Sequence, residues 1–220
     1  MTSSFDRLVE SQLVDKVYLF EELASTNTEA VRWLKEKRAL PERLLLIARR
    51  QDQGRGQFQR VWWSSERSLT FSIILPWRRL PYERDASAQL SIHVAKAVLL
   101  AIRHYLNAAG VDATPLRVKP PNDVYFGPKK LAGILIESPC PQSVVLGIGV
   151  NLNNRQEEYP PALTDCITSV YDLTQCEVTP VDFLQILLQD LLPSRLLAGR
   201  EPATPKKEQP TRVTSEGEAY

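Results

Sequence analysis

The chain has 220 residues, of which 43% are hydrophobic and 24% are charged, so its composition is that of a globular protein rather than a disordered or collagen-like one. Its 27 basic and 26 acidic side chains give a formal net charge of +1, which provides no overall attraction to nucleic acid or to an anionic membrane. Three cysteines without a CxxC pair, and two histidines far from them, argue against both a disulfide framework and a zinc site.

The first residues, "MTSSFDRLVESQLVDK", mix acidic with apolar side chains and show no signal peptide. No apolar run approaches the length of a membrane span. We therefore expect a cytoplasmic protein without a nucleic-acid or membrane partner.

Six segments have the β-branched, aromatic or alternating pattern that is typical of strands. They are residues 16–23, 43–50, 68–75, 116–119, 130–138 and 143–153. A glycine-bearing loop, "QDQGRGQFQRVWWSSE" at 51–66, separates the second strand from the third.

Three segments have the apolar periodicity of helices, at residues 25–40, 86–109 and 179–192. Thr26 with Glu29, and Thr179 with Asp182, have the spacing of capping boxes. Gly110 directly follows the long middle helix, as a glycine C-cap does. The mixed order of elements predicts an α/β domain of the α+β type, with a mixed β-sheet flanked by helices.

The composition changes after about Gly199. The segment "REPATPKKEQPTRVTSEGEAY" contains three prolines, alternating charges and almost no large apolar residue, so it cannot bury enough surface to offset its ordering entropy. We expect one domain at residues 1–199 and a disordered tail at 200–220.

The loop "QGRGQFQR", residues 53–60, has two glycines around Arg55 that let the backbone approach a ligand. Arg55 and Arg60 bring cations to the same place, which suits a carboxylate or a phosphate. A solvent-exposed hairpin loop explains this stretch equally well when it is taken alone.

Three further signals each allow two interpretations. The triplet at 25–27, Ser-Thr-Asn, has residue types that lead at helix caps, which is sufficient to explain it. Lys119 ends a strand where two prolines leave the sheet, so it is either a rigidly placed cation for a reacting anion or a solvated strand end. Gly147 and Gly149 either relieve packing against a helix or admit a ligand.

In their order along the chain, these signals resemble the motifs of the biotin protein ligases, which join biotin to carrier proteins. That family has a serine-threonine-asparagine triplet, then GRGRxGRxW, KWPNDV, KLAGILxE and GIGxNxN. The counterparts here are Ser25-Thr26-Asn27, "GRGQFQRVW" at 54–62, "KPPNDV" at 119–124, "KLAGILIE" at 130–137 and "GIGVN" at 147–151. The resemblance extends from about Lys16 to Leu197 and implies the biotin/lipoate protein ligase catalytic-domain fold.

The resemblance implies that biotin and ATP, with Mg²⁺, form biotinyl-5′-adenylate and pyrophosphate, after which a lysine of a biotin carboxyl carrier protein receives biotin and AMP leaves. It assigns catalysis to Lys119 and Arg55. The implied biotin-binding residues are Ser25, Thr26, Asn27, Gln51, Gly54, Arg55, Gly56, Gln57, Lys119 and Gly133. The implied ATP- or adenylate-binding residues are Arg55, Arg60, Trp62, Lys119, Asn122 and Asn151. No protein side chain is expected to ligate a metal, and a homodimer is a possible assembly.

The chain departs from the family pattern at two places. Gln57, Phe58 and Gln59 stand where the family has arginine, a variable residue and glycine, which removes one cation and one flexible hinge from the basic loop. Pro120 stands where the family has tryptophan.

The flanks of the chain also differ from those of many members. About 15 residues precede the first strand, too few for the DNA-binding domain that some members carry. The segment 200–220 has no strand pattern for the small C-terminal β-domain of most members, so we expect a bare catalytic domain. Two alternatives fit the same sequence: a lipoate or octanoate ligase of the same fold, and a non-catalytic biotin-binding pseudoenzyme. Retention of Lys119 and Arg55 argues against the latter.

Overall fold

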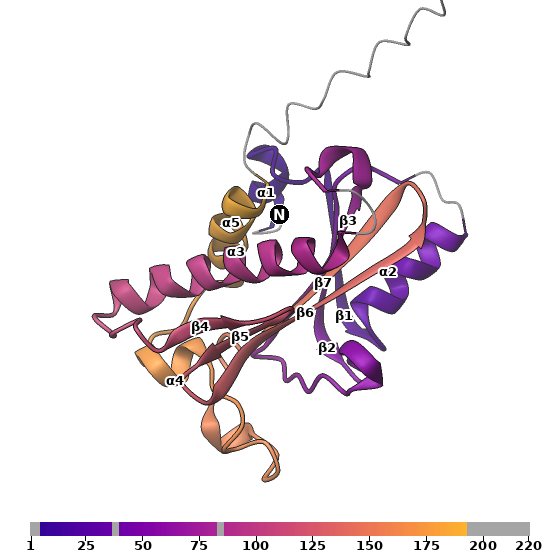
Figure 1. Ribbon diagram of the computed structural model, residues 1–220. Coiled ribbons are helices and arrows are strands. Elements are labelled where there is room, and N and C mark those ends of the chain that lie inside the picture. Colours follow the sequence, from indigo (N-terminus) through magenta and orange to yellow (C-terminus); the bar gives the residue numbers. More distant parts are fainter. Residues whose placement is uncertain (1–4, 37–39, 83–85, 193–220) are drawn as a thin grey trace, which may run out of the picture.

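The computed structural model describes residues 5–36, 40–82 and 86–192. Within them, seven strands form one sheet in the order β1-β2-β3-β7-β6-β5-β4 (Figure 1). The strands are β1 (Lys16–Leu23), β2 (Leu44–Gln51), β3 (Leu69–Pro76), β4 (Leu116–Lys119), β5 (Asp123–Phe126), β6 (Lys129–Cys140) and β7 (Ser143–Val150). β1 and β2 pair in parallel and every other neighbouring pair is antiparallel. The predicted mixed sheet is therefore confirmed.

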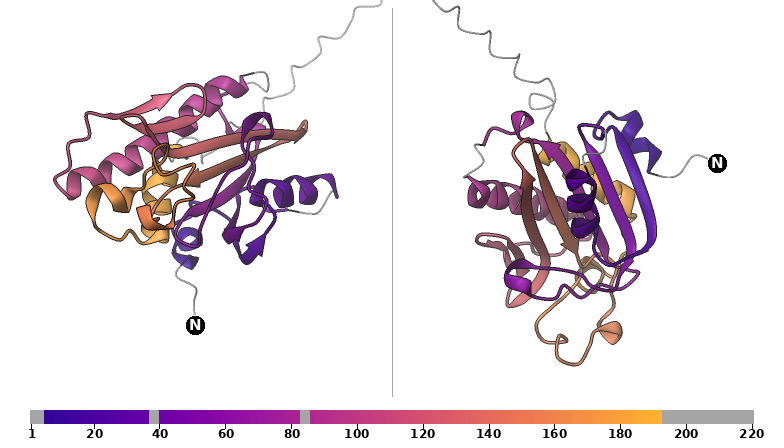
Figure 2. Two further views of the ribbon diagram at one scale, coloured as in Figure 1. Left: turned by 90° about the horizontal axis from the view of Figure 1, so that it is seen from below. Right: turned by 90° about the vertical axis from the view of Figure 1, so that its right-hand side faces the viewer.

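Helices cover both faces of the sheet. They are α1 (Asp6–Glu10), α2 (Thr26–Lys35), α3 (Ser87–Ala108), α4 (Val170–Thr174) and α5 (Pro180–Leu191), with short 3₁₀ turns η1 (Gln57–Gln59), η2 (Trp77–Arg79) and η3 (Gln156–Glu158). Figure 2 shows α2 on one side of the sheet, and α3 with α5 on the other. None of the helices in the described ranges combines the length and the apolarity that crossing a membrane requires.

The continuous apolar run of β2 serves both faces. Leu45 and Ile47 join the main core, which contains α3 and α5, whereas Leu44 and Leu46 pack with Trp33 of α2 in a second cluster. Successive strand residues point to opposite faces, so a strand that is covered on both sides needs apolar residues throughout. This double coverage fixes α2, whose first turn borders the site, against the middle of the sheet.

Two cap predictions are corrected by the structure. Ser25, not Thr26, is the N-cap of α2, and its hydroxyl accepts from the Thr28 amide at 3.4 Å. The Thr26 hydroxyl instead hydrogen-bonds the Ser72 hydroxyl at 2.8 Å, so it is engaged by the sheet. At α5, Thr179 is the N-cap residue as predicted, but its side chain makes no capping bond. The short elements α1, α4 and β5 were not predicted.

The long helix ends as its sequence predicts. Gly110 has a φ of +72°, and its amide bonds the Asn107 carbonyl at 3.0 Å. The Val111 amide bonds the Leu106 carbonyl at 2.9 Å, which completes a glycine C-cap. The expected tail at 200–220, together with 193–199, lies outside the described residues.

Candidate functional site

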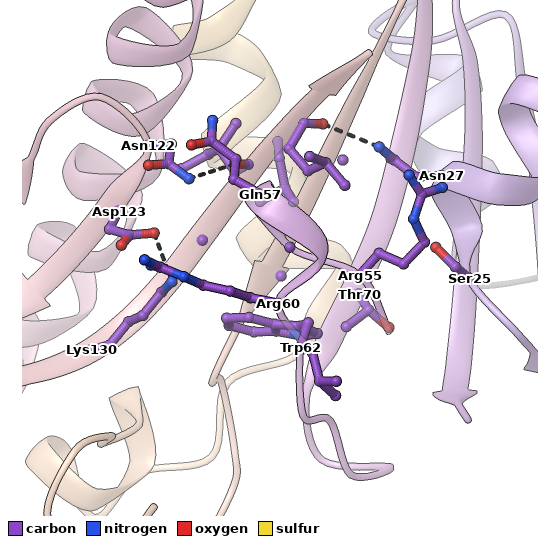
Figure 3. A pocket seen from close by; sticks show the side chains of 18 of the residues that line it. Ser25, Asn27, Arg55, Gln57, Arg60, Trp62, Thr70, Asn122, Asp123 and Lys130 are labelled. Carbon is purple, nitrogen blue, oxygen red and sulfur yellow. Dashed lines mark hydrogen bonds and ion pairs between the residues drawn. The ribbon is translucent and has the colours of Figure 1, made fainter. Parts of the chain in front are cut away.

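A pocket of about 350 Å³ opens where the N-terminus of α2, the loop after β2, the turn after β4, and strands β6 and β7 meet (Figure 3). Most of the residues predicted from sequence line it. These are Ser25, Thr26, Asn27, Gln51, Arg55, Gly56, Gln57, Arg60, Trp62, Lys119, Asn122 and Gly133. Gly54 and Asn151 are not among its lining residues.

The loop at 54–62, here called the basic loop, folds back on itself as a small hairpin. The Gly56 amide donates to the Arg60 carbonyl at 2.7 Å, and the Trp62 amide donates to the Gly54 carbonyl at 2.9 Å. A Cβ atom on Gly54 would overlap the Trp62 carbonyl oxygen. Gly54 therefore serves the closure of the basic loop and does not line the pocket.

Asn27 has protein partners at both ends of its amide. Its Oδ1 accepts from Ser72 Oγ at 2.6 Å, while its Nδ2 donates to the Leu135 carbonyl at 3.2 Å and to Glu137 Oε2 at 2.8 Å. Its side chain packs directly on Gly147, where a Cβ would lie 2.6 Å from Asn27 Cγ. These contacts make Asn27 a rigid part of the pocket wall.

Lys119 lies at the exit of β4, exposed, with its ammonium 5.1 Å from the centre of the Tyr125 ring. The structure adds a second lysine, Lys130, which pairs with Asp123 at 2.6 Å and lies 5.6 Å from the Trp62 ring. In Figure 3, Arg60 extends toward Asp123 and Lys130. Three cations against one carboxylate make this side of the pocket suitable for an anion.

The pairing of Lys130 with Asp123 was not predicted from sequence. It depends on β5, where Asp123 lies opposite Gly133, and on a register shift between Val124 and Tyr125 that brings Lys130 opposite Tyr125. A signal existed in "KLAGILIE", which begins with Lys130.

Asn151 is 1% exposed, and its side-chain amide hydrogen-bonds backbone carbonyls. Its Nδ2 donates to the Lys130 carbonyl at 3.3 Å and to the Thr168 carbonyl at 3.2 Å. The Lys130 amide in turn donates to the Cys166 carbonyl at 2.8 Å. The structure thus places Asn151 behind Lys130 and not in the pocket, which does not support the direct nucleotide contact predicted for it. Asn122 does line the pocket, and its Nδ2 donates to the Ile134 carbonyl at 3.1 Å.

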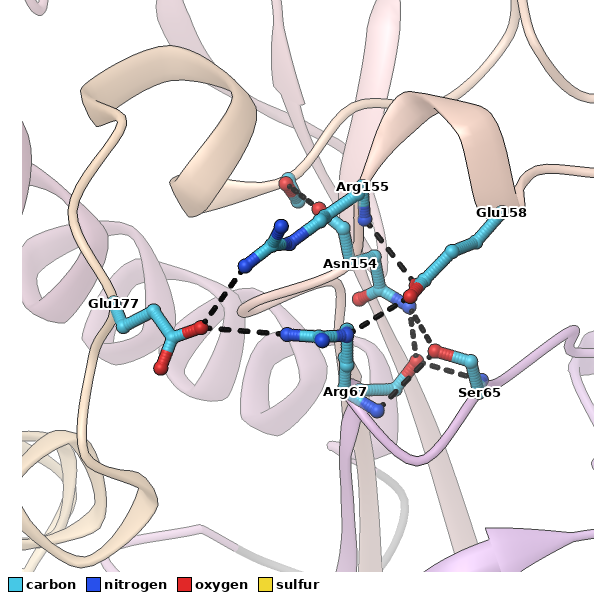
Figure 4. A network of polar contacts seen from close by, with 8 residues as sticks. Ser65, Arg67, Asn154, Arg155, Glu158 and Glu177 are labelled. Atoms are coloured by element: carbon cyan, nitrogen blue, oxygen red, sulfur yellow. Dashed lines mark hydrogen bonds and ion pairs between the residues drawn. The ribbon is translucent and has the colours of Figure 1, made fainter.

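A polar network secures the chain just beyond the basic loop (Figure 4). Asn154 donates to the hydroxyls of Ser65 and Ser68 at 2.9 and 2.7 Å. Arg67 pairs with Glu158 at 2.9 Å and with Glu177 at 3.3 Å. The chain that follows the basic loop is therefore tied to the segment that follows β7.

Tyr159 belongs to the same region, where its hydroxyl donates to Asp172 at 2.7 Å and its ring meets Trp63 edge-on. Burial, and then the hydrogen bond to Asp172, raise the pKa of Tyr159 above its usual value of about 10. The unfolded chain consequently ionises this phenol at a lower pH than the folded chain, so its stabilising contribution is complete below about pH 10 and declines as pH rises further.

We expect Tyr159→Phe to lower the free energy of unfolding by about 1–2 kcal/mol at neutral pH, because the partly buried hydrogen bond to Asp172 is lost. The difference in the free energy of unfolding between the two proteins should narrow between about pH 8 and about pH 10.5, since only the parent protein has the Tyr159 phenol to ionise. Urea unfolding of both proteins at the two pH values measures it, and an equal deficit at both would contradict the assigned pKa direction.

Within the described residues, no three His, Cys, Asp or Glu side chains gather in a way that would hold a metal ion.

The sequence model of the biotin/lipoate A/B protein ligase family matches residues 19–153. The bifunctional ligase/repressor BirA of Bacillus spizizenii is 27% identical over 184 residues, which are 82% of this chain and 54% of that protein. The biotin–[acetyl-CoA-carboxylase] ligase of Paracoccus denitrificans is 36% identical over 169 residues, covering 74% of this chain and 66% of that protein. The chain spans about half the length of the BirA relatives that it matches.

Solved structures agree with the sequence relatives. The biotin protein ligase from Aquifex aeolicus in complex with biotin and ATP has a TM-score of 0.67 and 28% identity, over 83% of this chain and 70% of that one. The biotin protein ligase from Leishmania major in complex with biotinyl-5-AMP has a TM-score of 0.65 over 92% of this chain and 90% of that one, and at 20% identity it supports the fold alone. The chain thus belongs to the biotin/lipoate A/B protein ligase family, and its catalytic domain is of the biotin protein ligase type.

Proposed function

We propose that this protein activates biotin with ATP and transfers it to a lysine of a biotin carboxyl carrier protein. The observation that carries the proposal is the composition of the pocket. One wall presents the polar first turn of α2. The opposite side gathers Arg60 and Lys130 (Figure 3), with Lys119 opposite Asp123 in the pairing of β4 with β5. The polar wall suits a neutral polar head group, and the cationic side suits a reacting pair of anions.

In the first step, a carboxylate oxygen of biotin bonds to the α-phosphorus of ATP, and the bond to pyrophosphate breaks. Two anions must approach each other, so Lys119, Lys130 and Arg60 have to offset their repulsion in a partly desolvated site. Mg²⁺, which we expect to accompany ATP, would neutralise further phosphate charge. Trp62, which borders Lys130, is the aromatic surface that we assign to adenine.

In the second step, the neutral amine of an acceptor lysine attacks the acyl carbon of the adenylate, AMP leaves and the amine loses a proton. The protein supplies no nucleophile, so its task is to hold the adenylate where the acceptor can reach it. A carrier protein with an exposed lysine is the partner that this chemistry requires. A homodimer and a cytoplasmic location remain predictions.

Biotin-dependent exchange of labelled pyrophosphate into ATP tests the proposal, with lipoate and octanoate as controls. Exchange with biotin alone is the expected result. Exchange supported by lipoate or octanoate but not by biotin would assign the other activity of the family. Thermal stabilisation by biotin without any exchange would identify a binding protein that has lost catalysis.

Gln57 lines the pocket in place of the arginine of the family pattern. We expect Gln57→Arg to slow dissociation of the biotinyl-adenylate about tenfold, because a charge-assisted hydrogen bond to phosphate is stronger than a neutral one by about 1.4 kcal/mol. Gln53→Arg is the matched control, since it adds the same charge to an exposed position that does not line the pocket. Dissociation of the adenylate is measured by rapid mixing with excess unlabelled biotin. Equal rates in all three proteins would show that the Arg60 cation or the Phe58 ring already makes up for the missing arginine at position 57.

A further inference from the structure

Glu137 joins two separate elements through its two carboxylate oxygens. Oε1 accepts from Arg55 Nη2 of the basic loop at 3.0 Å, and Oε2 accepts from Asn27 Nδ2 of α2 at 2.8 Å. The side chain of Glu137 is 25% exposed, so the carboxylate is partly shielded from water at the edge of the pocket. One acidic residue on β6 therefore meets both the basic loop and the wall.

Arg55 is engaged on a second side as well. Its Nη1 donates to Thr28 Oγ1 at 3.1 Å, so the guanidinium is shared between α2 and β6. In Figure 3, Arg55 lies beside Ser25 and Asn27, whereas Arg60 extends toward Asp123 and Lys130 on the other side of the pocket. The two arginines of the basic loop thus have different surroundings, and the charge of Arg55 is already paired.

Apart from the Trp62 indole at its C-terminal end, which packs on Gly149 of β7, the basic loop has few other contacts that hold its position. Its backbone hydrogen bonds, from Gly56 to Arg60 and from Trp62 to Gly54, fix its shape but join it to itself. Phe58 and Val61 are 88% and 85% exposed. Of the side chains described between Gly54 and Val61, Arg55 is the one that hydrogen-bonds another element. Its contacts hold the hairpin against the wall.

We propose that Glu137 is a positioning residue and that its ion pair with Arg55 fastens the basic loop over the pocket. Arg55 on this proposal acts through the position of the loop and makes no contact with the reacting anions, which are met by Lys119, Lys130 and Arg60. The assignment deepens the proposed function, on which the identity of those anions rests. It replaces the catalytic role that the sequence suggested for Arg55.

The first test needs no ligand. Amide hydrogen exchange at Gly56 and Trp62 should quicken about two- to fivefold in Arg55→Gln and in Glu137→Gln, as expected for a half-exposed ion pair. The double variant should show no further increase over the faster single variant, because both changes remove one interaction. Arg49→Gln is the control, since it breaks the exposed pair with Glu21 at 3.2 Å on the same sheet. Quickening in Arg55→Gln alone, or in neither variant, would overturn the proposal.

Glu137→Gln keeps an oxygen that accepts from Asn27, so the wall should survive the change. Urea unfolding checks this. Thr28→Val, which removes the second contact of Arg55 without altering charge, provides an independent measurement of the same loop amides if the glutamine variant is unstable.

The second test separates positioning from direct catalysis by pyrophosphate exchange. Arg55→Gln and Glu137→Gln should raise KM for biotin by the same factor, about two- to fivefold, with kcat almost unchanged. Arg60→Gln should instead lower kcat. A fall of kcat in Arg55→Gln that Glu137→Gln does not reproduce would show that Arg55 touches the anions. If the parent protein shows no exchange with biotin, the proposed function fails, whereas the hydrogen-exchange result still decides the role of the ion pair.

Discussion

Replacing Lys119 by alanine is expected to lower biotin-dependent pyrophosphate exchange by about a hundredfold or more, and to leave the urea midpoint unchanged. Lys119 lines the pocket from the exposed end of β4, and the contact recorded for its side chain is with the Tyr125 ring. Its removal thus exposes no core and leaves no buried group unpaired. A cation that stabilises charge in the transition state is worth about as much as one oxyanion-hole donor, which is the basis of the expected loss.

Arg117→Ala is the matched control for this experiment. Arg117 is on the same strand and lies 5.3 Å from the centre of the same Tyr125 ring, but it does not line the pocket. We expect it to retain exchange activity. Loss of activity in Lys119→Ala together with a lower urea midpoint would make the turn after β4 a structural element. Unchanged activity would remove Lys119 from the mechanism.

Local patterns predicted the parts of the fold that local physics controls. The long apolar periodicity before Gly110 predicted α3. The β-branched runs predicted strands whose observed bounds differ from the predicted ones by only a few residues. β5 was missed because its four residues lie between a proline pair and a basic turn. It gains strand structure from β4 and β6 on either side, which no short window of sequence reveals.

The pocket, too, could be predicted from the sequence only in part. Motif order indicated which segments meet, and twelve of the fourteen residues predicted for the site line the pocket. Sequence did not reveal what each side chain contacts, because that depends on register and on tertiary neighbours. Asn151 illustrates this: it follows β7 as an apparent ligand residue, yet its amide binds the carbonyls of Lys130 and Thr168. Glu137 ends the "KLAGILIE" motif, but its ion pair with Arg55 depends on tertiary structure that the motif does not indicate.

Substitution of Gly149 by alanine is expected to weaken nucleotide binding at least about tenfold through displacement of Trp62, a loss of about 1.4 kcal/mol in binding. Gly149 is in the middle of β7, paired with Thr70 on one side and Gly133 on the other. A Cβ there would lie 2.6 Å from Trp62 Cζ2 and 2.7 Å from Trp62 Nε1. The strand is fixed between two neighbours, so the indole must move.

Movement of Trp62 is expected to disturb the side of the pocket that holds Lys119, Lys130 and Arg60. The indole carries the Lys130 ammonium on its face, and the Trp62 amide closes the basic loop on Gly54. Overpacking at such a site also costs about 1–3 kcal/mol of stability, so loss of binding has to be separated from general destabilisation. Gly127→Ala supplies that comparison. Gly127 has a φ of +54° and open space around its Cβ position, so alanine there costs about 1–2 kcal/mol through backbone strain without touching the pocket.

The experiment compares the two variants at matched stability. ATP affinity measured by calorimetry should fall in Gly149→Ala and stay at the parent value in Gly127→Ala, while both show a lower urea midpoint. The fluorescence of Trp62 is obtained by subtracting the spectrum of a Trp62→Phe variant. It should shift to longer wavelength in Gly149→Ala, because the indole moves away from β7. Equal ATP affinity in the two variants, with the fluorescence shift present, would mean that nucleotide does not use the surface of Trp62. Adenine would then have to bind elsewhere along the pocket.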